Sequence, residues 1–146
     1  MNTVPKVFAE DRQILESFLS TAAELSRMPH LKRRKAEESR SLFEAVAEPI
    51  DAQATERILT EFFGPAFSPA GDKPGFFKRR RPALRLLGGV NPEQVFYSRV
   101  FGKGEFYAAI WPWQSSPDCC TLHLGFCDLT DEDAELLQAM INEICS

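Results

Sequence analysis

No stretch of this 146-residue chain is apolar over the roughly 20 residues that a membrane-spanning helix requires. The N-terminal segment, MNTVPKVFAEDRQ, also lacks the basic start and the apolar run of a secretory signal peptide. Internal repeats and low-complexity tracts are absent as well. The sequence therefore predicts a soluble, cytoplasmic protein that does not associate with a membrane.

Sequence signatures of catalysis and cofactor binding are missing too. The chain contains no Ser-His-Asp order, no nucleophile elbow and no phosphate-binding glycine loop. Its glycines near Gly88 and Gly102 lack the lysine, the spacing or the following helix that such a loop needs. We therefore expect no cofactor and no enzymatic activity. An enzyme that uses His123 and a nearby thiol remains a third hypothesis.

Cysteine and histidine gather near the C-terminus, at Cys119, Cys120, His123 and Cys127. Residues four apart on one strand lie on the same face but roughly 13 Å from each other. The ligands of one zinc ion lie within about 2.3 Å of the metal, and the chain has no CxxC pair. The sequence therefore predicts no metal site, and the four cysteines, which include Cys145, are expected to be free thiols.

What the chain does contain fits one globular domain. Hydrophobic residues make up 44% of it and phenylalanine occurs 12 times, which is enough for a packed interior. A chain of this length can bury roughly 68–70% of its unfolded surface. We therefore expect residues 1–146 to form a single domain. Its expected parts are a helical half (1–64), a loop (64–76), a strand-rich half (77–129) and a C-terminal helix (130–145).

Positive and negative charges are distributed unevenly along the chain, whose net charge is −4. All 17 Lys and Arg residues lie in 1–103, whereas 104–146 holds eight acids and no base. Such asymmetry can indicate a polar partner surface. We interpret it instead as attraction between two parts of one fold, since scattered surface charge contributes little by itself.

Apolar residues repeat with helical spacing in four segments, at roughly 9–28, 31–47, 52–63 and from 130 onward. In the second segment the apolar stripe is strong only in the later half, and arginine–glutamate pairs at i,i+4 indicate a solvated helix. Asp51 and Thr130 are the expected N-caps of the last two helices. The apolar stripe of the first segment comprises Ile14, Leu15, Phe18, Leu19, Ala22 and Leu25, and that of the last comprises Leu136, Leu137, Met140, Ile141 and Ile144.

A strand is expected at 83–88, and alternating apolar residues predict a three-stranded meander over 95–127. The sequence Gly102-Lys103-Gly104 suits a three-residue turn in which Gly104 is left-handed and forms a bulge. A two-residue turn would instead move one strand's side chains to the opposite faces. With the longer turn, the core face holds Phe96, Ser98, Val100, Phe106, Ala108, Ile110, Cys120, Leu122, Leu124 and Phe126. The second face then holds Tyr97, Arg99, Phe101, Tyr107, Ala109, Trp111, Cys119, Thr121, His123, Gly125 and Cys127.

The order of helices, strands and a final helix predicts the α+β class. We expect an antiparallel sheet of three to four strands, with the N-terminal helices and the C-terminal helix packed on it. The second sheet face is either exposed or covered by the N-terminal helices, and the sequence leaves both arrangements open.

Aromatic and arginine side chains on the second face predict a binding surface. Trp, Tyr and Arg are the residues enriched at the energetic centres of protein interfaces. We therefore expect a small non-enzymatic module that binds a protein or peptide partner, or a second copy of itself, through this face. The predicted surface comprises Tyr97, Arg99, Tyr107, Trp111 and Trp113.

A basic run beside two phenylalanines supports an alternative function. It comprises Lys78, Arg79, Arg80 and Arg81, next to Phe76 and Phe77. Basic residues beside aromatic ones bind single-stranded nucleic acid through phosphate contacts and base stacking, and the run could also bind an anionic ligand. The whole chain has a pI near 5.3, however, whereas nucleic-acid-binding domains typically exceed about 9.

Overall fold

The computed structural model describes residues 4–34, 42–48, 52–66, 95–112 and 120–145. These residues form three α-helices, five β-strands and one short 3-10 helix. The helices are α1 (Arg12–Ser26), α2 (Ala52–Phe63) and α5 (Asp131–Ile144), and the 3-10 helix η1 is Lys6–Phe8. The strands are β1 (Leu31–Arg34), β2 (Phe43–Ala47), β3 (Val95–Phe101), β4 (Gly104–Pro112) and β5 (Cys120–Cys127).

All five strands belong to one antiparallel sheet, in the order β1-β2-β5-β4-β3. The pairing of β2 with β5 joins the hairpin β1–β2 to the meander β3–β4–β5. The expected α+β class is therefore confirmed, and the sheet has one or two more strands than the sequence predicted.

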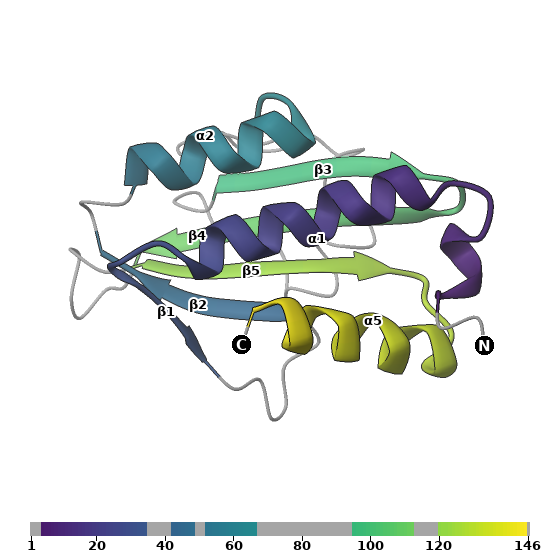
Figure 1. The fold of residues 1–146 in the computed structure, drawn as a ribbon. Coiled ribbons are helices and arrows are strands. Elements are labelled where there is room, and N and C mark those ends of the chain that lie inside the picture. The colour runs from purple at the N-terminus through teal and green to yellow at the C-terminus, as the bar shows by residue number, and fades with distance from the viewer. Residues whose placement is uncertain (1–3, 35–41, 49–51, 67–94, 113–119, 146) are drawn as a thin grey trace.

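The three helices lie on one face of the sheet, with α1 between α2 and α5 (Figure 1). Helix α1 forms as expected: its apolar stripe is buried, and the Asp11 carboxylate accepts a hydrogen bond from the Ile14 N–H at its first turn. The bounds of α2 match the predicted range 52–63, while its expected cap, Asp51, lies outside the described residues.

Helix α5 also forms where it was predicted, and it ties down the N-terminal turn. The Thr130 hydroxyl accepts a hydrogen bond from the Asp133 N–H, as expected of an N-cap. The buried Asp133 carboxylate accepts hydrogen bonds from the N–H groups of Lys6 and Val7, which begin η1. The predicted apolar stripe is wrong at its end, since Ile144 is exposed.

The predicted helix over 31–47 is wrong, because its two ends form the strands β1 and β2. Residues 35–41, between them, lie outside the described part of the chain. In β2 the side chains of Phe43, Ala45 and Ala47 are buried on the helix side, with half-buried residues in between. This period of two matches a sheet with one face against a core. Pairing with β5, about 80 residues along the chain, outweighs the helical preference that the arginine–glutamate spacing had indicated.

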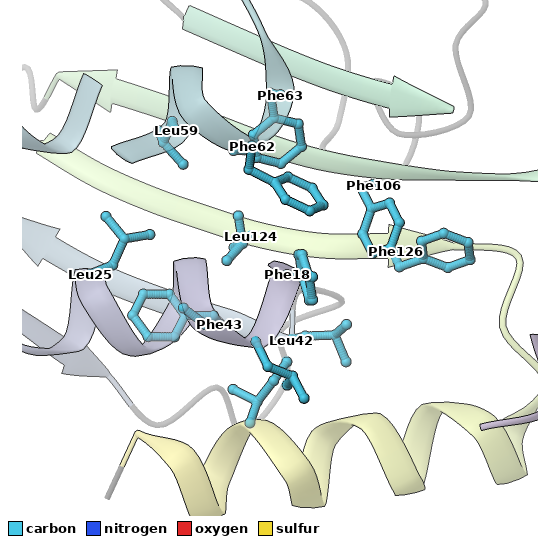
Figure 2. Packing of buried hydrophobic residues seen from close by; sticks show 14 of the residues in the cluster. Phe18, Leu25, Leu42, Phe43, Leu59, Phe62, Phe63, Phe106, Leu124 and Phe126 are labelled. Atoms are coloured by element: carbon cyan, nitrogen blue, oxygen red, sulfur yellow. The ribbon is translucent and has the colours of Figure 1, made fainter. Parts of the chain in front are cut away.

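A cluster of phenylalanine rings fills the space between the helices and the sheet (Figure 2). Phe106 of β4 lies at its centre, with ring centroids 4.6 Å from Phe126, 4.8 Å from Phe18 and 5.2 Å from Phe62. Figure 2 shows these rings reaching inward from β4, β5, α1 and α2. The same core therefore holds α1 and α2 against the sheet.

The turn between β3 and β4 has two residues rather than three. Phe101 pairs with Gly104, so only Gly102 and Lys103 form the loop. Gly102 has a φ of +59°, and a glycine with positive φ at the first loop position is typical of a type II′ turn. The expected left-handed Gly104 is wrong: this glycine lies against the Phe126 ring, where a Cβ has no room.

This turn shifts the register by one residue and exchanges the two faces of β3. The side chains of β4 and β5 lie on the faces that the sequence predicted. Tyr97 and Arg99, however, lie on the helix side, opposite Ala108 and Phe106. Ser98 lies on the other side with Tyr107, its partner in the pairing. The prediction that the tyrosines, Arg99 and Trp111 share one face is therefore wrong. The strand predicted at 83–88 lies outside the described residues.

Candidate functional site

The residues of the predicted aromatic surface are separated in the structure. Tyr97 and Tyr107 are both buried, and they lie on opposite faces of the sheet. Trp111 is half-buried on the face that carries none of the described helices, called the helix-free face below, and Arg99 is exposed on the helix side. Trp113 lies outside the described residues, as does the basic run 78–81, so their binding roles stay predictions. The described residues of the predicted surface therefore lie on two different faces of the sheet and do not form one surface.

Tyr97 belongs to the core between β3 and α2. Its ring centroid lies 5.9 Å from that of Phe63 at the end of α2. Burial raises the pKa of the Tyr97 hydroxyl, and nearby Glu56 raises it further, whereas a hydrogen bond with Thr60 lowers it. A tyrosine packed in this way holds the helix on the strand and does not reach a partner.

The helix-free face of the sheet carries a buried carboxylate beside a thiol. The Ser98 hydroxyl donates a hydrogen bond to the Glu105 carboxylate, and Cys127 faces Glu105 from β5. Burial raises the pKa of the Cys127 thiol to about 12, with further contributions from Glu105 and Asp128. Burial also raises the pKa of Cys145. These two thiols are therefore poor sources of the thiolate that a cysteine nucleophile requires.

His123 contacts a carboxylate and an indole. Its Nε2 lies 3.4 Å from Glu44 Oε1, and its ring meets the Trp111 ring edge-on at 4.8 Å. Burial lowers the pKa of His123, and although Glu44 raises it, Arg34 on β1 lowers it again. Among the described residues, no group of three or more His, Cys, Asp or Glu is arranged to hold a metal ion.

The depressed pKa of His123 predicts a loss of stability on acidification. Below the ordinary histidine pKa of 6.5, the unfolded chain takes up this proton more readily than the folded chain. His123 therefore contributes its full stabilisation of the fold above that pH. This stabilisation is lost as the pH falls toward the lower pKa that His123 has in the folded chain. We expect His123→Gln to reduce this part of the pH dependence, measured as the free energy of unfolding on both sides of the ordinary value.

His30 provides a matched control for this prediction. It also lies 3.4 Å from a glutamate, Glu48, but both side chains are about half exposed. His30→Gln should change the free energy of unfolding by less than His123→Gln does, because the more exposed side chain gives up less buried area. Equal effects of the two substitutions would contradict a special contribution of the half-buried His123.

Among the described strands, β3 forms one edge of the sheet, and Arg99 and Val100 in its second half are exposed. Helix α2 lies over the first half of β3 and ends before the strand does (Figure 1). Val95 to Tyr97 are buried or half-buried, whereas Arg99 and Val100 are exposed. Val100 is the most exposed large hydrophobic residue among those described, at 56%. An apolar side chain at an open edge marks a candidate interaction surface.

Part of the β3 main chain directs its hydrogen-bonding groups away from β4, the one described strand that pairs with β3. In a two-residue hairpin, the residues next to the turn, here Phe101 and Gly104, exchange both of their hydrogen bonds. Hydrogen-bonded pairs alternate with non-hydrogen-bonded pairs along an antiparallel ladder. Ser98 and Val100 occupy the non-hydrogen-bonded positions, so their N–H and C=O groups point away from β4.

A groove of about 440 Å³ opens beside this exposed half of β3, between α1 and α2. Glu16 and Glu24 of α1, Glu61 and Phe62 of α2, and Arg99 of β3 contribute to its lining. Arg99 is held in place, because its Nη1 donates to the Phe62 carbonyl at 2.9 Å and its guanidinium lies 4.7 Å from the centre of the Phe62 ring. The remaining charged lining is acidic.

The opposite edge of the sheet, β1, has a different character. It is only four residues long, and three of these are Lys32, Arg33 and Arg34. Arg33 turns to the helix side, where it lies over the Phe43 ring and donates a hydrogen bond to Asn142 of α5. Short length and positive charge are common protections against pairing at a sheet edge. Strand β3 is seven residues long and has one charged residue.

Comparison with known proteins supplies no function for this arrangement. No protein-family model matches the chain, and neither a curated protein nor a solved structure matches it significantly. No helix in the described parts of the chain has the length and apolar character needed to cross a membrane. The alternation in VFYSRVF indicated a strand, but the sequence did not show that this strand lies at an edge. An edge position depends on the order of all the strands.

Proposed function

We propose that this protein is a non-enzymatic module that binds a protein partner by adding an extended segment to the edge of β3. The observation that carries this proposal is that the main-chain groups of Ser98 and Val100 point outward where α2 no longer covers the strand. Many peptide-binding domains recognise a partner by such strand addition. The partner class is the one that the sequence indicated, but the surface differs.

The energetics of this edge favour an extended polypeptide. Each main-chain hydrogen bond contributes about 0.5–1.5 kcal/mol net, so affinity accumulates along several residues. Burial of the exposed Val100 side chain adds an apolar contribution at the same edge. Alternate side chains of the added strand would face the two sides of the sheet, which allows each side to select its own residue type.

The groove indicates which side chains the added segment carries on the helix side. Three glutamates line it (Glu16, Glu24 and Glu61), and its one arginine is already engaged by Phe62. Basic side chains complement this charge and suppress acidic partners. On the helix-free side, Val100 favours an apolar side chain. The expected segment thus alternates basic and apolar residues.

A synthetic peptide with three Lys-Val repeats, capped at both ends and dye-labelled, tests the proposal. Protein is titrated into a trace of this peptide, from nanomolar concentration upward, and the fluorescence anisotropy is followed. We expect saturable binding and stronger protection of the Ser98 and Val100 amides from hydrogen exchange. A peptide with Glu-Val repeats is the matched control and should bind more weakly, since its acids would face the glutamates of the groove.

Val100→Pro should weaken binding of the Lys-Val peptide about tenfold, because it removes an outward N–H and places a proline at the edge. Val100→Thr, which keeps a branched side chain and the N–H, should bind nearly as well as the wild type. Equal binding by the proline and threonine variants, or no binding to the Lys-Val peptide, would overturn strand addition at β3.

A further inference from the structure

We infer that Arg99 is a specificity-determining residue, which selects an acidic side chain at one position of the otherwise basic partner segment. This inference rests on the proposed strand addition and refines its partner: a lysine is followed, two residues later, by a glutamate or an aspartate. Three features support it, namely the charge of Arg99, the way in which Phe62 holds its side chain, and the pairing geometry of β3.

The guanidinium of Arg99 is held in position, but its charge is not neutralised. One of its nitrogens, Nη1, donates to the Phe62 carbonyl, and the group lies over the Phe62 ring. A guanidinium has five N–H donors, so this contact leaves donors for an acidic group. Among the described residues no carboxylate forms an ion pair with Arg99, although Glu61 lines the same groove. The exposed half of β3 thus presents a positioned cation.

The pairing geometry places one partner side chain directly opposite Arg99. An added antiparallel strand would form hydrogen-bonded pairs with Ser98 and Val100, whose main-chain groups point away from β4. Arg99 lies between these two residues, so it would occupy a non-hydrogen-bonded pair, in which opposed side chains approach most closely. Opposite charges stabilise such a pair and like charges destabilise it. An acid opposite Arg99 is therefore favoured over a lysine.

The next position on the helix side, opposite Phe101, favours a basic residue. The Phe8 ring, which precedes α1, lies 5.7 Å from the Phe101 ring, so the start of α1 lies at this end of β3. Glu16, close to the start of α1, lines the groove, and a lysine side chain from the added strand complements its charge. Because an antiparallel strand passes Phe101 before it reaches Arg99, the partner sequence reads Lys-Val-Glu in the N-to-C direction.

The first half of β3 limits how the segment can be placed. Helix α2 lies over this half, and both Phe96 and Tyr97 are buried there (Figure 1). The added segment therefore pairs with Ser98 to Phe101 and extends past the β3–β4 turn. A peptide whose acid stands at its first position can bring that acid to Arg99 only by laying its remaining residues along the covered half.

Three capped, dye-labelled peptides test the inference by fluorescence anisotropy at low ionic strength, where an exposed ion pair is screened least. The first is Lys-Val-Lys-Val-Glu-Val, which places its glutamate opposite Arg99. The second consists of the three Lys-Val repeats, and the third, Glu-Val-Lys-Val-Lys-Val, has the composition of the first with the acid moved to the start. We expect the wild-type chain to bind the first peptide about fivefold more tightly than either of the others.

Substitutions of Arg99 show whether this residue causes the preference. Arg99→Gln removes the charge, so the preference for the first peptide should disappear. Arg99→Glu should reverse the order, with the Lys-Val repeats bound more tightly than the first peptide. Arg99 is exposed, and circular dichroism checks that each variant is folded. Should Arg99→Glu fail to fold, the comparison of Arg99→Gln with the wild type decides the question alone.

The outcomes separate this inference from the proposed strand addition. If the wild type binds the first peptide and the Lys-Val repeats equally, and Val100→Pro weakens both, strand addition stands and selection by Arg99 is overturned. A preference for the first peptide that persists in Arg99→Gln has another cause and also overturns the inference. If none of the peptides binds, the proposed strand addition is overturned and the inference with it.

Discussion

Replacing Phe106 by alanine is expected to lower the free energy of unfolding by about 3–5 kcal/mol. This ring is fully buried at the centre of the phenylalanine cluster, where it contacts rings from α1, α2, β5 and η1 (Figure 2). Its removal would leave a cavity between helices and sheet that the surrounding elements cannot close without moving together. Urea unfolding followed by tryptophan fluorescence measures the loss.

Phe101→Ala is the matched control for this substitution. Its ring lies in the same cluster, 6.3 Å from Phe106, but it is only half-buried at the end of β3. The smaller apolar area that it loses should cost clearly less stability. A larger loss for Phe101→Ala than for Phe106→Ala would contradict the central position of Phe106, provided that the denaturant m-values of both variants match that of the wild type.

Gly125→Ala is expected to cost about 1–3 kcal/mol or more, although it adds a single methyl group. Gly125 of β5 faces Tyr107 of β4, and a Cβ at this glycine would lie 2.7 Å from the carbon that carries the tyrosine hydroxyl. Tyr107 is fully buried on the helix-free face, so its ring has little space into which it can move. Thermal unfolding should therefore show a clear decrease in Tm.

A double-mutant cycle identifies the cause of this loss. Tyr107→Ala removes the ring that the new methyl group would strike, so Gly125→Ala should cost much less in that background. If the alanine costs the same with and without the tyrosine, strand propensity explains the loss instead of the close approach. Either result also reports on the packing of the helix-free face, since the Tyr107 ring and a Cβ at residue 125 both lie on it.

The proposed binding mode differs from the sequence-based one by a single residue in register. With a three-residue turn, the side chains of Tyr97, Arg99 and Tyr107 would have formed one surface. The two-residue turn at Gly102 places Tyr97 beneath α2 and leaves Val100 exposed, with its main chain directed away from β4. Because side chains alternate along a strand, a slip of one residue exchanges a binding surface for a core.

Local sequence patterns were sufficient for the elements whose partners lie close in the chain. The apolar spacing of α1, the cap at Thr130 and the alternation in β4 and β5 all predicted structure that forms. The segment 31–47 shows where this approach fails. Its arginine–glutamate pairs favour a helix locally, whereas burial of Phe43 and pairing with β5 favour strands over its ends. Tertiary burial outweighs pair energies of about 0.2–0.5 kcal/mol.

The sequence by itself determined the α+β class, the three helices and the strand character of β3, because each follows from spacing within a few residues. Only the tertiary structure decided that β3 is an edge among the described strands, that α2 covers half of it and that Ser98 and Val100 direct their main chain away from β4. Those properties depend on strand order and on a turn whose two candidate lengths differ little in sequence. The physical reason is that a strand is an edge only where no other strand pairs with its outer side. No local pattern in the chain specifies which strands will pair.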